Sequence, residues 1–74
     1  MLKRFIMQNL PSDQRHMHLD TIVNNVFQDL QSVGRGMELK DIFNGFKELN
    51  KTQDLVMFSN GTVAATKKGL RSYA

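Results

Sequence analysis

Apolar residues recur at three- and four-residue intervals from Leu19 to Val33. This periodicity is the strongest constraint that the sequence places on the fold. Such spacing places apolar side chains on one stripe of a helix. The segment therefore predicts a central amphipathic helix. Gly34 and Gly36 follow it and predict a tight turn, because glycine tolerates the positive φ that commonly ends a helix. The members of the apolar stripe are Leu19, Ile22, Val23, Val26, Phe27, Leu30 and Val33.

The first segment predicts a short helix over residues 1–9. Its apolar residues lie at helical spacing, and Pro11 ends the pattern because proline lacks the N–H that a continuing helix needs. Ser12 and Asp13 carry side-chain oxygens that can accept from the free N–H groups of a first turn. We therefore expect these two residues to cap the helix that follows.

Residues 37–51 repeat the helical pattern and predict a third helix. Gly45 lies inside the segment and costs about 1 kcal/mol relative to alanine in a helix interior. A break at Asn44-Gly45 into two shorter helices is therefore the alternative. The apolar positions of this segment are Leu39, Ile42, Phe43, Phe46 and Leu49.

The residues after Asp54 change character and predict a β-hairpin. Leu55–Phe58 favours a pleated, partly buried strand, and Thr62–Ala65 is the expected returning strand. Between them, Asn60 and Gly61 form the dipeptide that favours a type I′ turn, whose two central residues both need positive φ.

The last residues predict a short helix that closes the fold. Thr66 can cap its first turn, and Leu70 and Tyr73 are spaced to fold back onto the core. The predicted fold class is α+β and mainly helical, with three helices, a β-hairpin and a short C-terminal helix. All 74 residues are expected to form a single domain, residues 1–74.

The excess positive charge lies entirely in the tail. Residues 1–54 contain seven Lys or Arg and seven Asp or Glu, which cancel, so the formal net charge of +3 resides on Lys67, Lys68 and Arg71. A basic segment of this kind is compatible with a polyanionic partner.

Several classes of function lack their sequence signals. The chain has no cysteine, and His16 and His18 are two apart, so they do not share a helix face; we expect neither a metal site nor a cofactor. No phosphate-binding loop and no nucleophile with a base at motif spacing is present, which predicts a protein that is not an enzyme. Apolar runs are too short for a membrane span or a signal peptide, and the expected location is the cytoplasm.

The order of the elements and the last twenty residues, 55–74, resemble a winged helix-turn-helix domain. The carriers of the resemblance are an apolar strand, a Ser-Asn-Gly-Thr tip, a small-residue strand and the Thr-Lys-Lys-Gly sequence of residues 66–69. They are similar to the wing and closing turn of that family. The resemblance implies a small transcriptional regulator that binds duplex DNA, with Met37–Lys51 in the major groove and Ser59–Thr62 on an adjacent minor groove or on phosphates.

The third predicted helix separates its charges into a basic and an acidic stripe. At about 100° per residue, Glu38, Asp41 and Glu48 fall beside a stripe of lysines and Asn44. Lysines can hold phosphates, and asparagine can pair with an adenine edge. The predicted DNA contacts of the whole chain are Lys40, Asn44, Lys47, Lys51, Asn60, Gly61, Lys67, Lys68 and Arg71.

The acidic stripe and the central helix support a second hypothesis, a protein-interaction module, adaptor or inhibitor, on a winged-helix-like scaffold without DNA binding. Opposite its apolar stripe the central helix carries amides and hydroxyls, where surface helices normally carry Lys, Glu and Arg. Amides lose less than charges on desolvation, so this amide face suits a protein partner or a second copy in a homodimer. Its residues are Asn24, Asn25, Gln28, Gln31 and Ser32.

Overall fold

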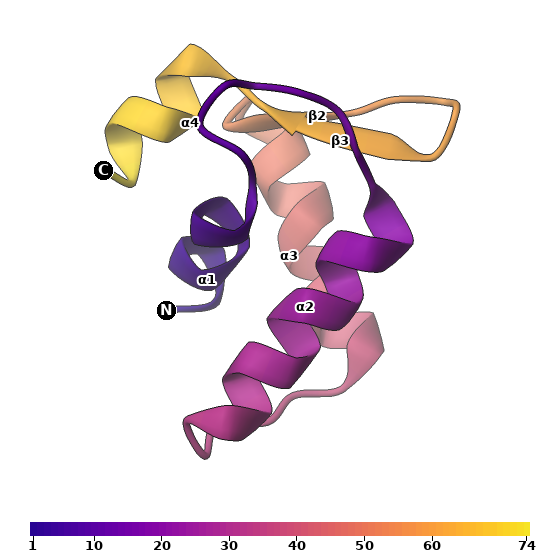
Figure 1. Ribbon diagram of the computed structural model, residues 1–74, viewed down its shortest axis with the longest axis vertical. Coiled ribbons are helices and arrows are strands. Elements are labelled where there is room, and N and C mark those ends of the chain that lie inside the picture. The colour runs from indigo at the N-terminus through magenta and orange to yellow at the C-terminus, as the bar shows by residue number, and fades with distance from the viewer.

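The computed structural model describes residues 1–74 as four helices and a three-stranded antiparallel sheet (Figure 1). This mainly helical α+β fold confirms the predicted fold class and is consistent with a winged-helix-like arrangement. The elements in chain order are α1 (Leu2–Asn9), β1 (Met17–His18), α2 (Leu19–Ser32), α3 (Leu39–Lys51), β2 (Leu55–Met57), β3 (Thr62–Ala65) and α4 (Lys67–Ser72).

The core lies between α1, α2 and α3 and is closed by the sheet. The predicted apolar stripes are buried along most of their length, but Val33, Leu39 and Phe43 are exposed. Leu70 of α4 and Tyr73, the residue that caps the C-terminal end of α4, pack against the core, as expected. The buried core residues are Ile6, Met7, Leu10, Ile22, Val26, Leu30, Ile42, Phe46, Leu49, Leu55, Val63 and Ala65.

Gly45 lies in the middle of one continuous helix, so the predicted alternative of a break at this position is wrong. The residue is buried against α1. A Cβ added there would lie 2.7 Å from Leu2 Cδ2 and 3.1 Å from Ile6 Cδ1. Glycine thus allows α1 and α3 to approach closely, and the resulting packing offsets its low helix propensity.

The strand β1 was not predicted from the sequence. This two-residue strand pairs with β3, with Met17 opposite Val63, and completes a sheet of order β1-β3-β2. The helix α2 begins directly after it, with His18 as its N-cap and no side-chain cap hydrogen bond. The prediction that Ser12 and Asp13 cap this helix is therefore wrong, because a loop and a strand separate them from it.

The hairpin forms where the sequence predicts it, but the type I′ turn is wrong. Gly61 has φ +83°, whereas Asn60 is not among the residues with positive φ. Gly61 N donates to Phe58 O at 3.1 Å, and Phe58 N donates to Thr62 O at 2.8 Å. These bonds define a three-residue loop, in which a turn is followed by glycine in the left-handed region.

Both α2 and α3 end with the same backbone motif, in which one left-handed residue lets the next N–H donate back into the last turn. After α2, Gly34 has φ +72° and Arg35 N donates to a carbonyl of that helix at 2.8 Å. After α3, Gln53 has φ +63° and Asp54 N donates to Leu49 O at 2.9 Å. The turn predicted at Gly34 is confirmed.

The short helix α4 is held against the end of α3. Thr66 caps it as predicted, since its Oγ1 accepts from Gly69 N at 3.0 Å, and the same hydroxyl donates to Gln53 O at 2.6 Å. Gly69 is buried, and a Cβ added to it would overlap the Asp54 carbonyl oxygen. Only glycine permits this contact between α4 and the segment that leads into β2.

We expect Gly69→Ala to lower the free energy of unfolding by about 2 kcal/mol. Alanine favours a helix by about 1 kcal/mol over glycine, but overpacking typically costs 1–3 kcal/mol, and here the overlapping atom belongs to the backbone and cannot rotate away. The measurement is urea unfolding followed by far-UV circular dichroism. Gly36→Ala is the matched control, because its Cβ would lie at an ordinary 3.6 Å from Gln31 Cγ. Equal stability of the two variants would contradict the close contact.

Candidate nucleic-acid interface

The four polar residues predicted to read DNA from the third helix lie together on the outward face of α3. All four are exposed, and at about 100° per residue they fall opposite the buried Ile42, Phe46 and Leu49. With Glu48, three of them line a shallow depression of about 500 Å³. We call this surface the basic stripe; it consists of Lys40, Asn44, Lys47 and Lys51.

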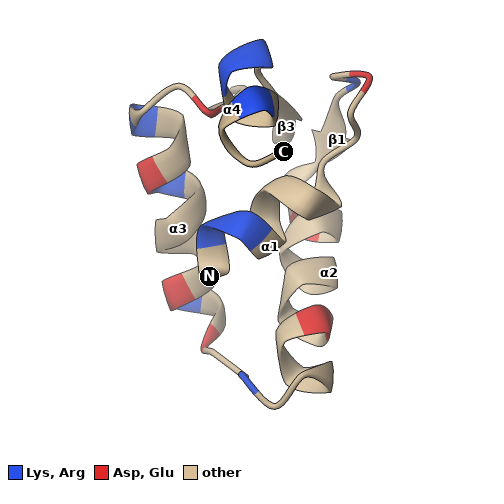
Figure 2. Cartoon of the chain, turned by 90° about the vertical axis from the view of Figure 1, so that its left-hand side faces the viewer, with Lys and Arg blue, Asp and Glu red and all other residues tan.

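The carboxylates of α3 and of its N-cap residue Glu38 lie beside the basic stripe, so that both signs of charge alternate along this part of the chain in Figure 2. Glu48 Oε1 lies 3.6 Å from Lys3 Nζ of α1, and Glu38 Oε2 lies 3.7 Å from Lys40 Nζ. Asp41 has no cationic partner within 4.0 Å. Exposed ion pairs of this kind contribute little stability. The contact with Lys3 nevertheless directs the Glu48 carboxylate toward α1.

The other flank of α3 is uncharged. Leu39 and Phe43 are exposed there, and Lys47 Nζ lies 5.4 Å from the Phe43 ring centroid, within the range of a cation–π contact. Asn50 Oδ1 accepts from Met57 N at 3.1 Å, which ties this side of the helix to β2. The basic stripe is therefore bordered by acids on one side and by neutral side chains on the other.

The predicted wing contacts, Asn60 and Gly61, are exposed at the hairpin tip, but the tip is without charge. Residues 55–66 contain no Lys or Arg. Asn60 Oδ1 accepts from Thr62 N at 3.2 Å and from its hydroxyl at 2.6 Å, and Gly61 O accepts from Leu19 N at 2.9 Å. Donors left for an anion here are the Ser59 hydroxyl, the Asn60 amide nitrogen and backbone N–H groups.

An aromatic stack supports the base of this tip. The rings of His16 and Phe58 have centroids 4.2 Å apart and are inclined by 17°, and His16 Nδ1 lies 3.4 Å from Thr62 Oγ1. Sequence reasoning missed this pair. No spacing rule signals it, because the pairing of β1 with β3 is what brings residue 16 beside residue 58.

The tail cations do not form one free group. Lys67 and Arg71 are exposed and have no carboxylate within 4.0 Å. Lys68 Nζ, in contrast, donates to Asp54 Oδ1 at 2.8 Å and to Thr52 O at 2.9 Å. Of the three tail cations that carry the formal net charge, Lys68 is therefore paired within the fold, whereas Lys67 and Arg71 are not.

Asp54 is the one buried carboxylate, with 5% of its surface exposed. The hydrogen bond from Lys68, and then that from the Thr52 hydroxyl at 2.5 Å, lower the pKa of Asp54 and outweigh the burial that raises it. The carboxylate is thus held in its ionised form. Sequence reasoning missed this centre, because an Asp and a Lys fourteen residues apart carry no local signal.

The free α4 cations and the hairpin tip lie at opposite ends of β3 (Figure 1). The strand alone, with four residues and three steps, is about 10 Å long at 3.3 Å per residue, so the two groups lie farther apart than that. Near the C-terminal end of α4, Arg4 Nη1 of α1 donates to Tyr73 O at 3.3 Å, and its guanidinium lies 5.9 Å from that ring centroid. Arg4 therefore adds to the positive charge around α4, a contribution that the sequence did not indicate.

The amide face of α2 is fully presented to solvent. Each of its five residues is exposed, and α2 contains no Lys or Arg. The carboxylates near it belong to Asp20 and Asp29, and Asp29 Oδ2 accepts from Asn9 Nδ2 at 3.0 Å. This surface differs in chemistry from the basic stripe and lies on another helix.

No group of three or more His, Cys, Asp or Glu side chains is placed to hold a metal ion. None of the four helices has both the length and the apolar character that crossing a membrane requires. Comparison with protein families, with curated proteins and with solved structures finds no match for this chain.

The low pKa of Asp54 predicts a specific loss of stability in acid. Because the folded-state pKa lies below the ordinary value of 3.8, Asp54 stabilises the fold above about pH 4, and this contribution is lost as the pH falls through the folded-state pKa. We expect the free energy of unfolding of Asp54→Asn to be lower than that of the natural chain at pH 7. The difference between the two proteins should shrink steadily below pH 4.

Urea unfolding at a series of pH values measures the free energy of unfolding of the natural chain and of Asp54→Asn. Asp13→Asn is the control, since Asp13 is exposed and paired only with Arg15 at 3.4 Å. Its free energy of unfolding, plotted against pH, should run parallel to that of the natural chain. A parallel curve for Asp54→Asn as well would show that the buried carboxylate does not contribute to the acid dependence.

Proposed function

We propose that this chain is a small DNA-binding regulator that contacts duplex DNA through the basic stripe of α3, with the cations of α4 as a second contact. The observation that carries the proposal is the composition of the outward face of α3. Every residue opposite the buried core is a lysine or Asn44, and the carboxylates lie on a flank.

The dimensions of α3 suit the major groove. A helix with its side chains is about 10–12 Å wide, and the groove is about 12 Å wide. With 13 residues, α3 is about 20 Å long at 1.5 Å per residue. Lysines at its rim can contact phosphates and fix the register, while Asn44 can reach a base edge.

The position of the acids decides how the helix can enter the groove. Like charges repel, so Glu48 and Asp41 disfavour a pose in which both rims of α3 approach phosphates. A helix tilted onto its basic and neutral sides avoids this repulsion. Since the hairpin tip has no cation, we expect Asn60 and Gly61 to add only neutral hydrogen bonds, and Lys67 and Arg71 to supply the remaining charge.

Binding to a labelled duplex of random sequence, followed by fluorescence anisotropy at several salt concentrations, tests the proposal. With five cations on phosphates (Lys40, Lys47, Lys51, Lys67 and Arg71), the slope of log K against log salt should be roughly −4 to −5. We expect Lys47→Gln to weaken binding about fivefold and to reduce the slope by about 1.

Arg15→Gln is the matched control, because it removes one positive charge from the loop before β1, away from α3. Its binding curve should stay close to that of the natural chain. Asn44→Ala, on a selected site, should reduce discrimination between sequences without changing the salt slope. The proposal fails if Lys47→Gln and Arg15→Gln reduce affinity equally.

A second candidate function rests on the amide face of α2. This face is exposed, carries no cation and lies on a helix other than α3, so a protein partner could occupy it without excluding DNA. The simplest partner is a second copy of the chain, which would present two copies of α3 in a symmetric dimer.

Self-association through the amide face predicts a dimer that Gln28→Lys disrupts. The lysine would place like charges on both copies near the centre of the contact, and an unpaired charge is costly to desolvate. Sedimentation equilibrium measures the mass, and circular dichroism shows whether the variant stays folded. A monomeric natural chain at high concentration would remove this form of the second candidate.

A further inference from the structure

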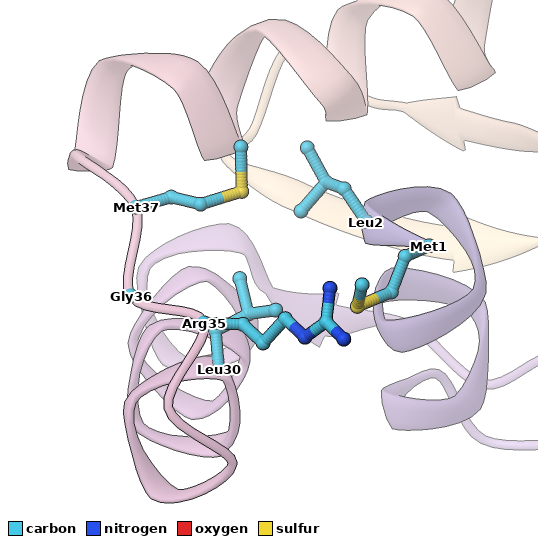
Figure 3. A pocket seen from close by; sticks show the side chains of 6 residues that line it. All are labelled: Met1, Leu2, Leu30, Arg35, Gly36 and Met37. Atoms are coloured by element: carbon cyan, nitrogen blue, oxygen red, sulfur yellow. The ribbon is translucent and has the colours of Figure 1, made fainter.

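A second pocket lies at the end of α2 and α3 that is remote from the sheet (Figure 1). It has a volume of about 310 Å³, near the lower end of the range for small-molecule sites. Two methionines and two leucines form most of its wall, and one arginine lies at its edge (Figure 3). The lining residues are Met1, Leu2, Leu30, Arg35, Gly36 and Met37.

The fold fixes the backbone of this arginine at the edge of the pocket. Gly34 reverses the chain after α2, and the N–H of Arg35 is bonded to Leu30 O at 2.8 Å, so the backbone of Arg35 is anchored on a buried residue of the same pocket. Figure 3 shows its side chain extending from the α2–α3 connection toward Met1, with Leu2 and Met37 on the other side of the cavity.

The charge at the pocket has no partner within the protein. No carboxylate lies within 4.0 Å of the Arg35 guanidinium. The first turn of α1, which contributes Leu2 to the wall, has no acidic residue and no side-chain cap, so its free N–H groups add to the positive potential. An apolar cavity with uncompensated positive charge at its edge is complementary to a ligand that is apolar at one end and anionic at the other.

We propose that this pocket binds a small apolar carboxylate, with the carboxylate on Arg35 and the hydrocarbon part against Leu2, Leu30 and Met37. The planar guanidinium matches a carboxylate with two parallel hydrogen bonds. Methionine side chains adapt to ligands of different shape, so the wall can accept a short aliphatic chain or a single aromatic ring. The proposal does not rest on DNA binding, because the pocket and the basic stripe are separate surfaces.

Titration of the isotope-labelled chain with sodium octanoate, followed by amide NMR shifts in the absence of DNA, tests the proposal. We expect shifts concentrated at residues 1–3, 30 and 34–37, with a dissociation constant on the order of 1 mM for so small a ligand. The uncharged probe 1-octanol should bind the same residues about tenfold more weakly, since it lacks the charge-assisted bonds to Arg35.

Two variants separate the charge from the apolar wall. Arg35→Gln keeps the backbone bond to Leu30 O, and it should weaken octanoate about tenfold while leaving 1-octanol unchanged. Met37→Ser should weaken both probes, and the control Arg15→Gln should change neither. Equal affinity for the two probes, undiminished octanoate binding by Arg35→Gln, or shifts outside the pocket would each overturn the proposal.

Discussion

The hydrogen-bonded carboxylate of Asp54 is the interaction on which the sheet end of the molecule depends. Gln53, in the left-handed region, turns the chain after α3 and places Asp54 at the start of β2. Its side chain then accepts from Thr52 and Lys68, and its carbonyl accepts from Thr66 N at 3.2 Å. Hydrophobic packing is not directional and would leave the angle of a six-residue helix loosely defined. The directed bonds to this one residue fix α4 relative to α3 and the hairpin.

This use of charge within the fold changes what the net charge means. Lys68 contributes to the formal excess of the tail, yet its charge is paired with that of Asp54 within the fold. Residues 1–54 have no net charge, yet their cations and carboxylates are separated in space, so part of this region still presents an uncompensated positive surface. Lys47 and Lys51 face outward from α3, whereas Glu48 turns toward Lys3 on α1. The surface that can bind an anion is therefore determined by the cations that have no carboxylate partner within the fold. The positions at which Lys and Arg are concentrated in the sequence are a poorer guide.

Local rules predicted most of the fold, and the misses involve contacts between distant segments. Periodicity located all three longer helices, and the Asn-Gly dipeptide located the hairpin. The strand β1 was missed because two residues carry no period, and they become a strand only by pairing with β3. The sequence interpretation of Gly45 considered only its low helix propensity. The close packing of α1 against α3 is the reason why a glycine occupies this position. Of the candidate site, the basic stripe followed from helix geometry. The engagement of Lys68 did not, because the hairpin must first reverse the chain before Asp54 can reach it.

The two charged residues that follow α2 and α3 show why one backbone motif can lead to a structural role in one place and a binding role in another. Arg35 and Asp54 occupy equivalent positions, each directly after the left-handed residue that ends its helix. Asp54 is buried and receives two side-chain donors, so its charge is satisfied and closed to other ligands. Arg35 is exposed at the edge of an apolar cavity and receives no acceptor from a carboxylate. A satisfied buried charge stabilises the fold, whereas an exposed, unpaired charge on an anchored backbone is available to an external anion, and the backbone at least need not be ordered when that anion binds.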